Sequence, residues 1–145
     1  MVRKLRREDV DAMSLRFHLI LEAVVAGYGV IEHMQCLTEV LLLCTVLVES
    51  GYGGTTLEIF SVMRRSAFQA IRNGMRGDKW YLDARGADAF ASILTFYDRL
   101  MNTVSATAFA TAIERLEKLI NLSIQDQIRS GIHLRKNEEL NHETK

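Results

Sequence analysis

The chain contains no proline in 145 residues, and this absence limits its fold more than any other sequence feature. Average usage near ~5% would supply about seven prolines. Proline breaks helix interiors and is common in the turns of β-rich domains. Long helices are therefore favoured over a sandwich with many turns. The glycine count of 9 is close to average, so glycines are available to separate the helices.

Five segments carry apolar residues at the three- and four-residue spacing of an amphipathic helix. The expected helices span about residues 8–26, 30–50, 56–76, 84–101 and 106–129. The second is apolar on most faces and is predicted to be the central, most buried helix. Gly51 is expected to end it in a left-handed conformation, and Asp83 and Ser105 to cap the last two helices. Thr55 and Glu58 match a capping box, and no segment alternates with period two, so no sheet is expected.

The predicted fold class is all-α, a compact four- to five-helix bundle with short glycine-containing turns. A single helical domain is expected over residues 8–130, preceded by a basic N-terminal arm at residues 1–7. Residues 131–145 lack an apolar stripe and are expected to form a flexible polar tail. A chain of this length can bury a core without disulfides. Cys36 and Cys44 lie about 12 Å apart along one helix, too far to bridge, and are predicted to be buried thiols.

Charge is balanced overall, with 18 basic and 18 acidic residues, but it is unevenly distributed along the chain. Residues 1–7 carry a net charge of +4, and residues 8–58 carry −7, with eight acids against Arg16 alone. Residues 59–79 return to +4. Such a layout can complement itself within the fold or between subunits, or it can present a basic face to an acidic partner. The zero net charge opposes bulk attraction to nucleic acid.

The sequence indicates a soluble, cytoplasmic protein with no membrane association. Charged residues interrupt the N-terminal region where a signal peptide would need its apolar core. The longest apolar run, residues 40–48, is nine residues long, whereas a membrane span needs ~20.

Sequence motifs for catalysis or cofactor binding are absent. No phosphate loop, serine nucleophile elbow, zinc-protease motif or dinucleotide-binding motif occurs. His33 and Cys36 share a helix face that a metal could use, but a half-buried histidine without a metal is the favoured interpretation. The glycine turn at residues 51–56 could bind an anion at the start of the third helix, although most such turns are connectors. No cofactor, metal or small-molecule substrate is therefore predicted, and the protein is not expected to be an enzyme.

One cluster of basic residues lies on and just after the predicted third helix, and we name it the basic ridge. Its members are Arg65, Arg72, Arg76 and Lys79. Their spacings of 7, 4 and 3 residues predict one shared face opposite the apolar stripe. The ridge could pair with the acids of the first two helices or be solvated. Alternatively, together with the N-terminal arm, it could follow a phosphate backbone.

Four groups of residues between positions 10 and 120 form a recognisable combination: Glu49-Ser50-Gly51-Tyr52-Gly53, Trp80-Tyr81-Leu82-Asp83, Phe90 with Ile93-Leu94-Thr95, and Tyr97-Asp98-Arg99. Together they resemble a set of short, uncharacterised proteobacterial proteins. Some of those proteins are labelled Fis-type transcriptional regulators, so the resemblance implies a DNA-associated role.

Taken together, these features predict a regulatory or protein-interaction module that acts as a homodimer or with a protein partner. The alternative is a DNA-associated transcriptional regulator that uses the basic ridge and the N-terminal arm. An enzyme or small-ligand binder that uses the glycine turn is a distant third.

Overall fold

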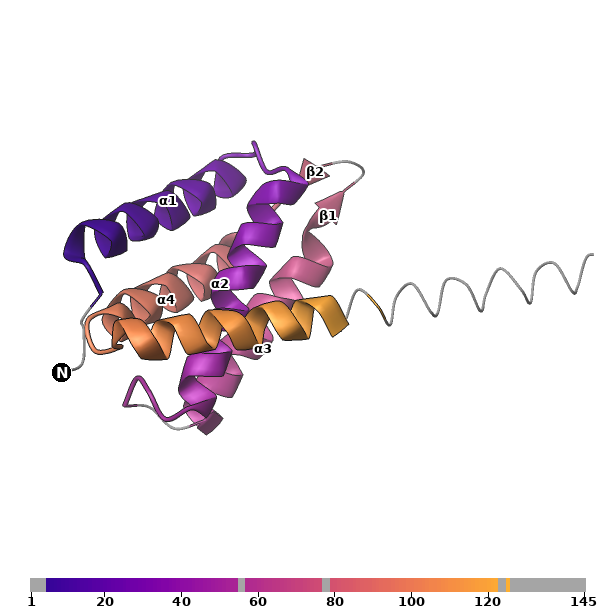
Figure 1. The fold of residues 1–145 in the computed structure, drawn as a ribbon. Coiled ribbons are helices and arrows are strands. Elements are labelled where there is room, and N and C mark those ends of the chain that lie inside the picture. The colour runs from indigo at the N-terminus through magenta and orange to yellow at the C-terminus, as the bar shows by residue number, and fades with distance from the viewer. Residues whose placement is uncertain (1–4, 55–56, 77–78, 123–124, 126–145) are drawn as a thin grey trace, which may run out of the picture.

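The computed structural model describes residues 5–54, 57–76, 79–122 and 125, and only the backbone of Leu57 and Arg76. Within these ranges the chain is helical apart from short connections and one hairpin, so the all-α prediction is confirmed (Figure 1). The labelled helices are α1 (Arg7–Val25), α2 (Ile31–Glu49), α3 (Leu57–Gly74) and α4 (Ala84–Met101). A further helix spans residues 106–122 and is called the C-terminal helix below.

Three of the predicted helix ends are confirmed. The Asp83 carboxylate accepts a 2.7 Å hydrogen bond from the Gly86 backbone N–H and caps α4. The Ser105 hydroxyl accepts one from Ala108 N–H, at 3.1 Å, at the start of the C-terminal helix. Gly51 follows α2 with a positive φ of 93°, as predicted for a left-handed helix end. The predicted capping box at Thr55 lies outside the described residues.

The prediction that the chain has no strands was wrong at one place. Strands β1 (Met75–Arg76) and β2 (Lys79–Trp80) form a two-residue antiparallel hairpin after α3. The Tyr81 N–H donates a 2.8 Å hydrogen bond to the Gly74 carbonyl, and the Trp80 N–H donates a 3.2 Å bond to the Gly29 carbonyl. Strands this short show no alternation in sequence, so only the tertiary fold reveals them.

Two glycines allow this hairpin to lie directly against neighbouring backbone. A Cβ atom on Gly29 would collide with the Trp80 carbonyl oxygen, and one on Gly74 would lie 2.7 Å from the Tyr81 carbonyl oxygen. Glycine permits this approach because it has no side chain. The hairpin therefore ties the end of α3 to the turn between α1 and α2.

Helix α2 is central, as predicted. Nine of its residues are buried, and it packs against α1, α3 and α4. Helices α1 and α3 each pack on both α2 and α4, so they flank these two helices on different sides (Figure 1). The length and composition of α2, with a mean hydropathy of 1.5, would also suit a membrane-crossing helix. The same apolar residues are those that a central core helix requires.

The C-terminal helix crosses in front of α2 (Figure 1). Its own residues Ala112 and Leu116 are buried, and Arg115 Nη2 lies 3.5 Å from Glu49 Oε2 at the end of α2. Residues 1–4 of the predicted basic arm and all of the predicted tail at residues 131–145 lie outside the described residues.

Candidate interaction surface on α3

The structure does not place the four residues of the basic ridge on one helix face. Helix α3 ends at Gly74, so Arg76 lies in β1 and Lys79 in β2, where the two residues face each other across the hairpin. The sequence prediction extended the helix about two residues too far, because the chain leaves α3 for the β1–β2 hairpin, where the Tyr81 N–H donates to the Gly74 carbonyl. Arg65 and Arg72 remain on α3, and both are exposed.

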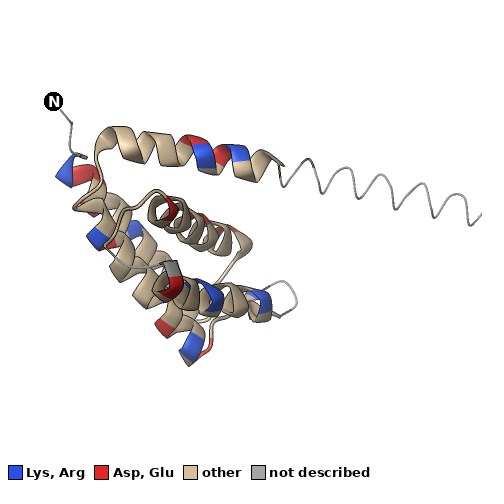
Figure 2. Cartoon of the chain, turned by 90° about the horizontal axis from the view of Figure 1, so that it is seen from below, with Lys and Arg blue, Asp and Glu red and all other residues tan. Residues whose placement is uncertain are grey.

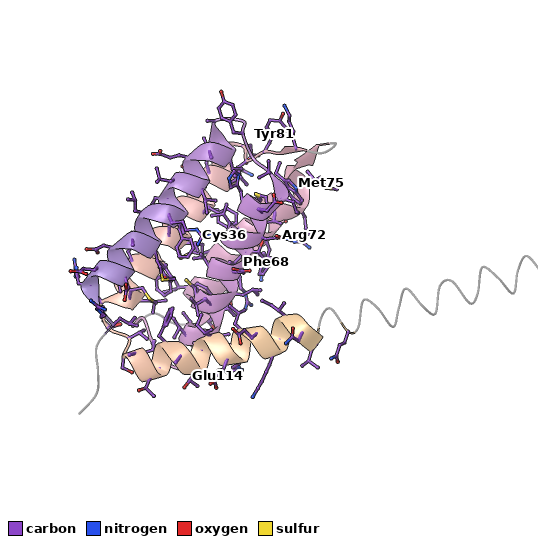
Figure 3. The ribbon with its side chains drawn as sticks, turned by 45° about the horizontal axis from the view of Figure 1, so that its top comes forward. Cys36, Phe68, Arg72, Met75, Tyr81 and Glu114 are labelled. Carbon is purple, nitrogen blue, oxygen red and sulfur yellow. The ribbon has the colours of Figure 1, made fainter. Side chains whose placement is uncertain are left out.

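Arg65 and Arg72 are brought together with a third arginine in a shallow pocket on α3. The pocket has a volume of about 450 Å³. It is lined by Ser61, Arg64, Arg65, Phe68 and Arg72. Phe68 and Arg72 extend from the same helix in Figure 3, and Figure 2 shows basic residues along α3 and the hairpin. We call this feature the arginine pocket.

The arginine pocket carries uncompensated positive charge within the described part of the chain. No acidic residue lines the pocket, and none of its three arginines takes part in an ion pair among the described residues. Arg65 and Arg72 therefore form no ion pair with described acids of the first two helices, contrary to one interpretation of the ridge. A guanidinium is suited to bind carboxylates or phosphates, because its donors form a planar fork.

Arg64 was missed as a site residue by the sequence reasoning. It is half-buried and directly precedes Arg65 of the basic ridge. The signal was present in the spacing of Arg64, Phe68 and Arg72, which recur every four residues and therefore share a face. A basic stripe interrupted by an aromatic residue is the pattern that identifies this pocket.

A larger groove of about 760 Å³ adjoins the arginine pocket between α3 and α4 and shares Arg65 with it. Its lining combines apolar and polar side chains from α3, α4 and the segment that leads into α4. They are Val62, Met63, Arg65, Ser66, Gln69, Ala70, Asn73, Tyr81, Asp83, Arg85, Gly86, Asp88, Ala89 and Ser92. Two arginines and two aspartates balance each other in this groove, and Asp83 is already engaged in capping α4.

Ser14, His18 and Asp98 form a polar cluster between α1 and α4 that the sequence reasoning also missed. The Ser14 hydroxyl donates a 2.6 Å hydrogen bond to Asp98 Oδ1, and His18 Nε2 lies 3.0 Å from Asp98 Oδ2. In a catalytic triad the serine would bond to the histidine instead. Here the aspartate receives both groups, so the cluster joins two helices. The i,i+4 spacing of Ser14 and His18 was the available signal.

Two buried groups lie close to this cluster. Burial raises the pKa of the Cys44 thiol from 9.0 to about 12, and the charge of Asp98 adds to the effect. Burial also raises the pKa of Tyr97, whose hydroxyl is buried without a hydrogen-bond partner in the described structure. Cys44 is buried, as predicted, whereas Cys36 is only half-buried.

His33 contributes to helix capping. The Val30 backbone N–H donates a 3.3 Å hydrogen bond to His33 Nδ1 at the start of α2. The residues with described positions contain no group of three His, Cys, Asp or Glu side chains arranged to hold a metal ion.

A scan against family models and searches of curated proteins and solved structures find no significant match to this chain. The resemblance to proteins labelled Fis-type regulators therefore stays a prediction.

Proposed function

We propose that this protein is a cytoplasmic, non-catalytic regulatory or interaction module that binds an acidic segment of a protein partner through α3. The observation that carries the proposal is the arginine pocket. Three arginines converge there without an acidic partner among the described residues. An acidic side chain entering this pocket would form charge-assisted hydrogen bonds, which are the stronger kind in proteins.

The surroundings of the pocket favour a protein partner. Val62 is 64% exposed on α3, and Met63 is half-buried in the adjoining groove. Apolar contact area beside charged groups is typical of protein interfaces, in which a small apolar centre is surrounded by a polar rim. A helical segment with acidic and apolar residues on one face fits both features.

A DNA-associated role is the second candidate, and Phe68 among the arginines is the observation that favours it. Arginines can contact phosphates, and an aromatic side chain can support stacking. The zero net charge of the chain counts against this role, because nucleic-acid affinity depends strongly on accumulated positive charge.

Titration with two defined polyanions tests these candidates. Poly-L-glutamate represents an acidic protein segment, and a short DNA duplex represents nucleic acid. We expect the wild-type protein to bind polyglutamate more tightly than the duplex at physiological salt. Replacing Arg65 and Arg72 together by alanine should weaken polyglutamate binding by about tenfold or more, because each arginine contributes a charge-assisted contact.

A matched control changes two exposed basic residues elsewhere. Arg99→Ala with Lys118→Ala alters the net charge equally but leaves α3 unchanged, and this variant should bind like the wild type. An equal loss of polyglutamate affinity in both double variants would mean that only net charge matters and would contradict the proposal. Duplex binding that exceeds polyglutamate binding, with a log–log salt slope reduced by about 0.9 per lost contact in the α3 variant, would establish the DNA role instead.

A further inference from the structure

Helix α1 has an exposed face that complements α3 in charge and apolarity. Leu15 and Leu19 lie one helical turn apart and are 61% and 54% exposed. The remaining members of this face are the exposed acids Glu8, Asp11 and Glu22. All five lie within about 80° around the helix at 100° per residue, so they form one stripe with two leucines between acidic ends.

This stripe is separate from the face of α1 that enters the core. Phe17, Leu21 and Val24 are buried against the bundle, so α1 is apolar on two sides. A helix inside a monomeric bundle needs one apolar side, and a second one is typical of a helix that contacts a partner. Glu8 and Asp11 do form ion pairs with Arg6 and Arg7, but these pairs are highly exposed and therefore weak.

The matching face of α3 has the opposite charge. Val62, Arg65, Gln69 and Arg72 are all exposed and recur at three- and four-residue spacing. If α1 packs antiparallel with Leu19 over Val62, its acids at Glu8 and Asp11 lie about 12–17 Å further along, at 1.5 Å per residue. Arg72 lies about 15 Å from Val62 on the same scale. The acidic end of α1 thus meets the basic end of α3.

The two faces cannot meet within one molecule. Helices α1 and α3 lie on different sides of α2 and α4 (Figures 1 and 3). From the complementarity and the separation we infer that the acidic partner of the arginine pocket is α1 of a second copy of this chain. The contact is head-to-tail: α1 of one molecule binds α3 of the next. The inference rests on the proposed function and identifies its partner.

A head-to-tail contact has a consequence that a two-fold dimer lacks. Each molecule in such a contact still offers one free α1 face and one free α3 face, so association continues into rings or filaments. The wild-type protein should therefore form species larger than dimers as its concentration rises. Added salt should reverse this association, because the exposed charges are screened.

Two defective variants, measured by sedimentation or light scattering, give the decisive test. Leu15→Ser with Leu19→Ser removes the α1 face, and Arg65→Glu with Arg72→Glu reverses the α3 face; all four positions are exposed, so folding should persist and is checked by circular dichroism. Each variant alone should be monomeric. Their mixture should form a dimer and stop there, because only one intact α1 face and one intact α3 face remain.

Leu119→Ser with Arg99→Glu is the control, since both positions are exposed outside the two faces, and it should associate like the wild type. An α3 variant that still dimerises alone, or a mixture that stays monomeric, overturns the inference. A wild-type protein that stays monomeric at every soluble concentration also overturns it. The α1 variant then separates the two proposals: if it binds polyglutamate the proposed function stands, and if it does not, both fail.

Discussion

The Ser14 hydroxyl on α1 donates a 2.6 Å hydrogen bond to Asp98 Oδ1 on α4. The two residues are 84 positions apart in sequence, and their bond joins a flanking helix to a central one. His18 Nε2 lies 3.0 Å from the other oxygen of the same carboxylate. Asp98 therefore fixes α1 at two successive turns. It thereby also fixes the orientation of the exposed stripe of leucines and acids on α1.

Removing this carboxylate tests how much the cluster stabilises the fold. Asp98→Ala should lower the free energy of unfolding by about 1–2 kcal/mol, less than for buried charged hydrogen bonds, because the His18 and Asp98 side chains are 41% and 37% exposed. Chemical denaturation measures the change. Asp88→Ala, an exposed position on the same helix, should have little effect. Equal costs for both variants would show that the cluster contributes nothing.

Shortening a buried side chain on the central helix should have the largest effect on stability. Leu43 on α2 is 4% exposed. Leu43→Ala should cost about 2–5 kcal/mol through lost apolar burial and the cavity left behind. Glu114→Ala on the exposed face of the C-terminal helix is the near-neutral control. A cost below that of a surface change would mean that α2 is peripheral.

Substitutions of Tyr97 distinguish the stability contributed by its buried ring from the stability lost by burying its hydroxyl. The ring packs edge-on against Phe17 with centroids 5.3 Å apart, while the hydroxyl has no hydrogen-bond partner in the described structure. Tyr97→Phe should keep the protein as stable as the wild type or stabilise it by about 1–3 kcal/mol. Tyr97→Leu should destabilise it because the aromatic contact is lost. A destabilised Tyr97→Phe variant would reveal that the hydroxyl is used.

The raised pKa of the Cys44 thiol leads to a prediction of how the free energy of unfolding changes at high pH. Its pKa is about 12 in the folded protein, above its ordinary value of 9.0, so the folded state holds the proton more tightly than the unfolded state. The resulting stability is fully present below pH 9 and is lost as pH rises towards 12, by at most about 1.4 kcal/mol per pH unit. The unfolding free energy of Cys44→Ala should therefore fall less steeply over this window.

Cys36→Ala serves as the comparison for that measurement. Burial also raises the pKa of Cys36, but this thiol is only half-buried. Its removal should alter the pH profile less than removal of Cys44. Identical profiles for the wild type and Cys44→Ala would contradict the assigned burial of this thiol.

Local features of the chain were predictable from sequence because they depend on neighbouring residues. The aspartate at position 83 caps α4, and Gly51 ends α2, each through backbone geometry or hydrogen bonds that reach only a few residues. The apolar pattern likewise placed α2 at the centre of the bundle. These features depend on helix periodicity and capping, and both can be recognised from the order of residues in the sequence.

The sequence alone thus determined the helices, the helix ends at Gly51, Asp83 and Ser105, and the central position of α2. Only the tertiary structure decided where α3 ends, because the hydrogen bonds to Gly74 and Gly29 come from a hairpin whose strands are too short to show a pattern. It also decided that Arg76 and Lys79 leave the face of Arg65 and Arg72. The place of Arg64 on that face, by contrast, was visible in its four-residue spacing from Phe68 and Arg72. Contacts between distant segments depend on how helices pack, and spacing along one segment carries no record of that packing.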